Sequence, residues 1–344
     1  MSTSNQPASP IPIAIGAEQV REAARRLAPW VHRTPVLTSQ TLDERAGARV
    51  YLKCENLQRV GAFKFRGAMN ALLQLTGAQK AAGVVTHSSG NHAQALALAG
   101  RLLNIPVTVV MPNTAPTIKR EATAGYGATI RFCEPTLEAR EAAVADEIAR
   151  NGQTLVHPFN DWNVIAGQAT AAWELFDQTE ELDIVIAPVG GGGLISGTAL
   201  AANARSPETR VIGAEPERAD DARRSLASGR IEPSGDPKTI ADGLRTSLGE
   251  RTFAVISRHV DRIETATETE ILDAARFVWE RLKIIIEPSS AVAVAPLLNR
   301  RLGLDGERVG VILSGGNVDV GPFFESLAAK CGGKSQIPAR SASE

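Results

Sequence analysis

A lysine lies between two phenylalanines in the segment GAFKFRG, residues 61–67. An ammonium group is costly to bury among aromatic side chains, and the loss of hydration lowers the pKa of the amine. A neutral amine is a nucleophile toward carbonyl groups and a base once that carbonyl has been transferred away. Lys64, between Phe63 and Phe65, is therefore the first candidate for catalysis. The alternative is a lysine that reaches from the end of a strand into solvent.

Four consecutive glycines, residues 190–193, follow an apolar run and precede a helix that we expect to begin near Leu194. Glycines let backbone N–H groups approach an anion, and the N-terminal end of a helix adds a partial positive charge. The run therefore predicts a phosphate site, although a tight turn would also use glycine. A phosphate site and Lys64 together indicate a phosphorylated aldehyde, pyridoxal phosphate (PLP).

A dinucleotide is the rival ligand for the glycine run. Gly191, Gly193 and Ser196 nearly trace the pattern G-x-G-x-x-G. Glu215 follows about 20 residues later, where an acid that binds ribose would lie. This rival leaves Lys64 without a role.

Short β-branched runs alternate with alanine-rich helical segments along the chain. This order is typical of an α/β protein in which helices cover both faces of a parallel sheet. Ligands of such sheets lie at the C-terminal ends of the strands, so the loops that follow the strands should carry the chemistry. The predicted strands are ARVYLKC, GVVTHSS, PVTVVM, ATIRFC, LDIVIAPV, RVIGAEP and RVGVILS, with helices from about Arg66, Asn91, Thr117, Leu137 and Leu194.

Four of the strand ends are polar or glycine-rich, namely HSSGNH, PVGGGGLISG, AEPERADD and SGGN. We expect them to line one crevice. The economical arrangement is a small domain, residues 77–159, inserted into a larger one, residues 15–76 and 160–328. Each domain would have a mostly parallel sheet flanked by helices, with PLP in the cleft between them. Residues 1–14 and 329–344 are polar and predict tails.

The composition excludes several classes of partner. The 344 residues carry a net charge of −1 without blocks of like charge, so no field attracts nucleic acid or an anionic membrane. No apolar run approaches the roughly 20 residues of a membrane helix, and the N-terminus lacks the pattern of a signal peptide. Cys54, Cys133 and Cys331 have no metal-ligand spacing, which predicts reduced thiols and a cytoplasmic location.

Several motifs together resemble the tryptophan-synthase-β-like (fold type II) PLP enzymes, and within them serine racemase and the serine/threonine dehydratases. The motifs occur in the order of that family between about Ala17 and Phe324. The resemblance implies a small amino-acid substrate and a homodimer, and it leaves room for a nucleotide effector. The motifs are GAFKFRGAMNAL, THSSGNHAQALALA, HPFNDWNVIAGQ, PVGGGGLISG, AEPERADD, TIADGL, IIIEPSSAVAVA and VILSGGNVD.

The resemblance implies a role for each matching residue at the cofactor. Lys64 would bind the cofactor aldehyde as an imine and act as a base on one face of it. Ser314 would face the pyridine nitrogen, where a neutral hydroxyl does not enforce protonation of the ring. For Glu287, placed near the ring, capping of a helix before Pro288 is an equal alternative. The other implied contacts are Phe63 beside the lysine, Asn91 at the phenolic oxygen, and Gly190, Gly191, Gly192, Gly193 and Leu194 at the phosphate.

The resemblance also places residues around the substrate. Ser89 matches the serine that in racemases lies on the face of the cofactor opposite the lysine, where it can exchange a proton with Cα. Arg140 and Thr246 match positions near the distal end of the substrate, although exposed arginines are common in charged helical segments such as that of Arg140. The loop implied to grip the substrate carboxylate comprises Ser88, Ser89, Asn91 and His92.

A divalent cation is a further implication of the resemblance. Glu215 and Asp221 match carboxylate ligands, and Ala219 matches a carbonyl ligand. Such hard oxygen ligands suit Mg²⁺, Ca²⁺ or Mn²⁺. Spacing alone would favour a solvated acidic turn for the segment EPERADD.

The predicted activity is PLP-dependent β-elimination, which converts L-serine and L-threonine to a 2-oxo acid and ammonia. The alternatives are a serine racemase that uses Lys64 and Ser89 as two bases, and a 3-hydroxyaspartate dehydratase of the same fold. A dinucleotide-binding oxidoreductase or a non-catalytic binding module is a more distant alternative.

Overall fold

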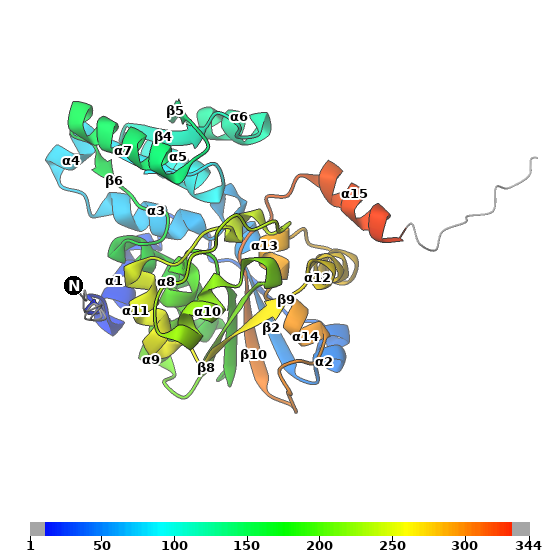
Figure 1. The fold of residues 1–344 in the computed structure, drawn as a ribbon. Helices are drawn as coiled ribbons and strands as arrows, with labels where there is room; N and C mark the ends of the chain where they lie inside the picture. Colours follow the sequence, from blue (N-terminus) through cyan, green and yellow to red (C-terminus); the bar gives the residue numbers. More distant parts are fainter. Residues whose placement is uncertain (1–10, 332–344) are drawn as a thin grey trace, which may run out of the picture.

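The computed structural model describes residues 11–331 (Figure 1). Residues 1–10 and 332–344, the greater part of the two expected tails, lie outside the described residues. Helix α1 (Ala17–Leu27) is the first helix and α15 (Val320–Cys331) the last. No helix in this part of the chain is both long and apolar enough to cross a membrane.

A six-stranded sheet has the order β1-β2-β10-β7-β8-β9. All neighbouring strands are parallel except β1, which pairs antiparallel with β2. The sequence predicted four of these strands, but not the short β1 or the partly buried β9. The strands are β1 (Val36–Leu37), β2 (Arg49–Cys54), β7 (Ile184–Pro188), β8 (Arg210–Pro216), β9 (Arg262–Ala266) and β10 (Arg308–Leu313).

A separate four-stranded sheet has the order β5-β4-β3-β6, and all its pairs are parallel. The predicted α/β class, with two mostly parallel sheets flanked by helices, is therefore confirmed. The two-residue β6 escaped prediction, because two residues show no periodicity. The strands are β3 (Val84–His87), β4 (Val107–Pro112), β5 (Thr129–Cys133) and β6 (Thr154–Leu155).

Helices flank both sheets, and α3 contacts both α5 and α8 (Figure 1). The other α-helices between α1 and α15 are α2 (Gln40–Ala46), α3 (Lys64–Leu73), α4 (Gly77–Ala82), α5 (Asn91–Leu103), α6 (Thr117–Gly125), α7 (Leu137–Asn151), α8 (Trp162–Gln178), α9 (Gly193–Arg205), α10 (Asp221–Ser228), α11 (Glu250–His259), α12 (Glu268–Leu282), α13 (Pro288–Ala291) and α14 (Ala295–Leu298).

Glycines bring α3, α8 and α9 into close contact. A Cβ on Gly167 of α8 would lie 2.6 Å from Cα of Gly67 in α3, and a Cβ on Gly197 of α9 would lie 2.5 Å from the backbone nitrogen of Ala169 in α8. Any larger residue would push these backbones apart. The close packing fixes the first turn of α3, and with it Lys64, against the helices of the six-stranded sheet.

A buried cluster of charges lies beside this packing. Arg66 is fully buried and donates to both carboxylate oxygens of Glu55, at 2.7 and 2.8 Å. It also donates to both oxygens of Glu174, at 2.8 Å each. Lys53 is fully buried too, and its Nζ donates to Glu174 at 2.7 Å. The sequence did not single out Lys53, because burial here depends on Glu174, 121 residues away.

Replacement of Arg66 by alanine should destabilise the protein by about 3–5 kcal/mol, because it leaves the fully buried Glu55 without its main partner and removes one of the two cations that pair with Glu174. Equilibrium denaturation measures this change. The matched control is Arg150→Ala, which removes a largely exposed ion pair with Asp146 and should cost at most about 1 kcal/mol. Equal losses in the two variants would contradict a structural role for the cluster.

Candidate active site

Lys64 is the first residue of α3 and is partly buried. Its Nζ donates to the carbonyl oxygen of Pro158 at 2.9 Å and lies 5.2 Å from the ring centre of Phe63. Burial lowers the pKa of Lys64 to about 8, and the nearby Glu287 carboxylate opposes this shift in part. A pKa of about 8 leaves roughly a tenth of the amine neutral at pH 7. The lowered pKa that the sequence predicted is therefore present.

The two phenylalanines beside Lys64 have different environments. Phe63 faces the amine, whereas Phe65 is fully buried in the core between α3, α5 and the four-stranded sheet. Consecutive residues of a helix point about 100° apart, so they cannot enclose one side chain between them. Of the two aromatic neighbours in the sequence, Phe63 therefore lies at the amine and Phe65 packs in the core.

A tight turn after β6 supplies the carbonyl that holds Lys64. His157 Nδ1 accepts hydrogen bonds from the backbone N–H groups of Phe159 and Asn160, at 3.3 and 2.9 Å. Its proton is therefore on Nε2, and burial lowers the pKa of His157 to about 3. This turn directs Pro158 toward Lys64. The sequence did not reveal His157 or Pro158 as site residues, because one acts through the backbone and the other is a backbone carbonyl.

The glycine loop joins β7 to α9 and packs against Phe159. A Cβ on Gly191 would lie 2.3 Å from the Phe159 ring, and Gly192 has a φ of +86°, so only glycine fits either position. Among the described residues, none accepts a hydrogen bond from the N–H groups of Gly191, Gly192 or Gly193. Leu194 follows in the first turn of α9 and is buried. Free N–H donors at the start of a 13-residue helix fit a phosphate group.

Asn91 and Glu287 meet although 196 residues separate them. Asn91 Nδ2 donates to both carboxylate oxygens of Glu287, at 3.0 and 3.1 Å, and its Oδ1 accepts from Asn317 at 2.9 Å. Burial raises the pKa of Glu287 to about 7. Glu287 precedes α13 but makes no side-chain capping bond, so the capping alternative was wrong. Asn317 lies in the SGGN motif, and the sequence analysis assigned it no role.

The end of β10 connects these groups to Lys64. Ser314 is buried, and its carbonyl oxygen accepts from the backbone N–H of Phe63 at 3.0 Å. The carbonyl oxygen of Gly315 accepts from the backbone N–H of Glu287, also at 3.0 Å. Ser314, Phe63 and Glu287 are thus held by one short segment.

The loop between β3 and α5 holds the predicted carboxylate-binding residues. Ser88 and Ser89 are partly buried, and Ser88 Oγ accepts from the backbone N–H of Gly90 at 3.2 Å. His92 is buried, and its Nε2 donates to the Val156 carbonyl at 3.3 Å. Burial holds the pKa of His92 well below its usual range. Its ring is therefore neutral, and its Nδ1 is buried without a hydrogen-bond partner among the described residues.

Arg140 lies close to this loop. Burial lowers the pKa of His87, the last residue of β3, and the Arg140 guanidinium lowers it further. Arg140 is partly buried, and its Nε donates to the Thr136 carbonyl at 3.3 Å. Thr246 follows the 3₁₀ turn Asp242–Leu244. In the part of the chain that the structure describes, Thr246 makes no hydrogen bond to Lys64 or the glycine loop.

The predicted cation ligands are buried, so the alternative of a solvated acidic turn was wrong for Glu215 and Asp221, although Glu217 between them is exposed. Glu215 ends β8, and its carboxylate accepts from the N–H groups of Ala222 and Arg223 at the start of α10. Burial raises the pKa of Glu215 to about 9 and that of Asp221 to about 7. Asp221 Oδ2 is buried with no hydrogen-bond partner in the described chain. No cluster of three or more His, Cys, Asp or Glu side chains suited to a metal occurs among the described residues.

The site thus combines a lysine whose pKa is lowered to about 8 with a glycine loop whose free N–H groups can hold a phosphate. Both features fit PLP, since Lys64 can bind its aldehyde and the free N–H groups of Gly191, Gly192 and Gly193 can hold its phosphate. The dinucleotide alternative fails on Glu215, because its buried carboxylate is engaged at the start of α10 and is not available to a ribose.

Comparison with known proteins agrees with this site. Residues 27–315 match the model of the family described as "Pyridoxal-phosphate dependent enzyme". The chain is 50% identical to a β-hydroxyaspartate dehydratase of Paracoccus denitrificans (strain Pd 1222), over 88% of this chain and 96% of that protein. It is 47% identical to an L-threo-3-hydroxyaspartate ammonia-lyase of Saccharomyces cerevisiae, over 90% of this chain and 96% of that protein.

A solved structure shows the same fold. The serine racemase of Dictyostelium discoideum superposes with a TM-score of 0.85 and 48% sequence identity, and the match covers 89% of this chain and 99% of that one. The chain belongs to the pyridoxal-phosphate-dependent enzyme family, in its fold type II branch. The resemblance drawn from the sequence motifs is confirmed.

The pKa of Lys64 predicts how fast cofactor-free protein takes up PLP. Only the neutral amine attacks the aldehyde, so the rate should rise about tenfold per pH unit below pH 8 and level off above it. Stopped-flow absorbance of the imine band measures the rate. Lys64→Ala should form no such band. A rate that keeps rising to pH 10 would show that the amine has its ordinary pKa.

Proposed function

We propose that the protein catalyses β-elimination from 3-hydroxyaspartate, releasing ammonia and leaving a 2-oxo dicarboxylic acid. The observation that carries the proposal is the place of Arg140, whose guanidinium lies close enough to His87 to lower its pKa, next to the Ser88–Ser89 loop. A second carboxylate on the substrate would give Arg140 a partner. Two relatives at 47–50% identity, named for 3-hydroxyaspartate, support this choice over L-serine and L-threonine.

The residues of the site have separable tasks. Bound PLP would supply an electron sink for the charge that develops at Cα. Lys64, whose amine is partly neutral near pH 7, removes the α-proton. The N–H groups of the loop before α5 bind the α-carboxylate, and Arg140 binds the β-carboxylate. Asn91 faces the cofactor, and its hydrogen bonds to Glu287 hold its side chain in place.

Arg140→Gln should lower kcat/KM for 3-hydroxyaspartate by about 10- to 100-fold, because it removes a charge-assisted hydrogen bond. Turnover of L-serine, which has no second carboxylate, should change little. Release of 2-oxo acid from both substrates measures this difference. The matched control is Arg150→Gln on the same helix, which should leave both rates unchanged. An equal loss for both substrates would assign Arg140 a structural role and contradict the proposal.

Serine racemisation is a second candidate, supported by the solved serine racemase structure at 48% identity and by a serine at position 89. Ser89 would exchange a proton with Cα from the side opposite Lys64. Ser89→Ala should abolish formation of D-serine while 2-oxo acid release continues, as followed by chiral chromatography. Ser88→Ala is the control. Equal D-serine formation by Ser89→Ala and the unaltered protein would contradict a two-base reaction.

We also propose that Glu215, Asp221 and the Ala219 carbonyl bind Mg²⁺ or a similar cation. Two buried carboxylates with an unpartnered oxygen support this assignment. Saturating Mg²⁺ should raise the Tm, by an amount that corresponds to about 2.7 kcal/mol at 100 times the Kd. Asp221→Asn should abolish the rise. Asp220→Asn, which changes a neighbouring carboxylate paired with Arg224, should keep it. A rise that persists in Asp221→Asn would place the cation elsewhere.

A further inference from the structure

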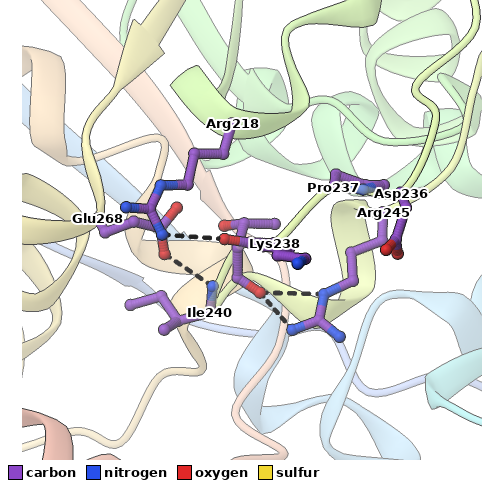
Figure 2. A pocket seen from close by; sticks show the side chains of 8 residues that line it. Arg218, Asp236, Pro237, Lys238, Ile240, Arg245 and Glu268 are labelled. Atoms are coloured by element: carbon purple, nitrogen blue, oxygen red, sulfur yellow. Dashed lines mark hydrogen bonds between the residues drawn. The ribbon is translucent and has the colours of Figure 1, made fainter.

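A hollow of about 450 Å³ lies on the six-stranded-sheet side of the molecule, outside the site described above (Figure 2). Its volume is within the range of about 300–1,000 Å³ that is usual for small-molecule sites. It is bordered by the 3₁₀ turn Glu217–Ala219 and by Glu268, the first residue of α12. The residues that line it are Arg218, Asp236, Pro237, Lys238, Thr239, Ile240, Arg245 and Glu268.

Three cationic side chains, those of Arg218, Lys238 and Arg245, line this hollow (Figure 2). None of them forms an ion pair with a carboxylate among the described residues, although two acids, Asp236 and Glu268, line the same space. Like charges that line one space repel one another, and an anion bound among them would reduce this repulsion. The lining has a charge of +1, from three cations and two acids.

Two of the cations are held in place by the backbone. Arg218 donates to the carbonyl oxygen of Lys238 at 3.2 Å, and Arg245 Nε donates to that of Thr239 at 3.0 Å. Each guanidinium has five N–H groups, so most of them remain available to a ligand. Lys238 Nζ has no partner in the described chain. Backbone contacts thus hold Arg218 and Arg245, although all three cationic side chains are exposed.

Glu268 adds an acceptor to these donors. Its Oε2 accepts from the backbone N–H of Ile240 at 2.7 Å, whereas its Oε1 is buried and has no partner among the described residues. A buried carboxylate oxygen needs a hydrogen-bond donor. A ligand that satisfies the whole hollow therefore carries two acidic groups for the cations and one donor for Glu268.

The hollow shares a chain segment with the glycine loop. Segment 239–245 begins and ends in the lining of the hollow and contains Leu244. The Cα of Leu244 lies 3.0 Å from the place of a Cβ on Gly190. Gly243 in the same segment donates to Ser289 Oγ at 3.0 Å, and Asp242 pairs with Lys119 of α6. A ligand that fixes Arg245 would hold this segment against the phosphate-binding loop.

We propose that this hollow binds a small anion with two acidic groups and one hydrogen-bond donor, and that the bound anion stabilises segment 239–245. Hydroxydicarboxylates have this chemistry, and hydrogenphosphate carries the same two charges and one hydroxyl donor on a single group. Arg218, Lys238 and Arg245 bind the acidic groups, and Glu268 accepts from the donor. The site is distinct from the PLP site, so failure of the proposed reaction would not affect it.

Isothermal titration calorimetry of the PLP-loaded protein tests the binding, with inorganic phosphate and L-malate as separate probes. All titrations use the Arg140→Gln background, so that the dicarboxylate site proposed beside PLP does not contribute. Lys238→Gln breaks no internal bond of the described residues and should weaken binding of the recognised probe at least tenfold. Arg218→Gln combined with Arg245→Gln should abolish it. Arg150→Gln, an exposed arginine on α7, is the control and should bind normally. Binding that is absent, or unchanged in both hollow variants, would overturn the proposal.

Two further comparisons test the details. Succinate lacks the hydroxyl of malate and should bind more weakly, since it leaves Glu268 without a donor; equal affinity would overturn the assigned ligand class. Hydrogen exchange of the PLP-loaded protein should slow at Ile240, Asp242 and Leu244, whose N–H groups donate to Glu268 Oε2, the Ile240 carbonyl and the Ala241 carbonyl respectively. Unchanged exchange at saturating anion would overturn the proposed effect on the segment.

Discussion

The buried contact between Arg66 and the carboxylates of Glu55 and Glu174 is the constraint on which the site depends. Arg66 lies two residues after Lys64 in α3, and its guanidinium has four hydrogen bonds of 2.7–2.8 Å to these two acids. Removing one partner would leave an uncompensated charge in the core, so α3 can neither rotate nor slide. Lys64 is therefore presented to the site by a helix whose position is fixed by electrostatics as well as by packing.

Burial then sets the chemistry of the groups around Lys64. It lowers the pKa of Lys64 to about 8 and raises that of Glu287 to about 7, because desolvation disfavours the charged form of both. Both shifts bring the pKa of these groups closer to neutral pH. The same cause keeps His92 and His157 neutral, which lets them act as fixed hydrogen-bond partners.

Much of the fold was predictable from local patterns. Seven strands followed from β-branched runs, and helices began at or within two residues of the predicted positions, as at Asn91 and Thr117. Lys64 and the glycine loop were predictable because an apolar setting for an amine and a run of glycines are rare in sequence. His157, Pro158 and Lys53 were not, since their roles come from partners that only the folded chain brings near them.

The sequence by itself determined the family, the α/β class and the residues able to bind a phosphorylated aldehyde, because these depend on residue type and short spacing. The tertiary structure decided which groups meet. It paired Asn91 with Glu287, brought Arg140 near enough to His87 to lower its pKa, and buried Glu215 and Asp221. These outcomes depend on distances between segments far apart in the chain, and pKa values follow burial, which no local pattern specifies.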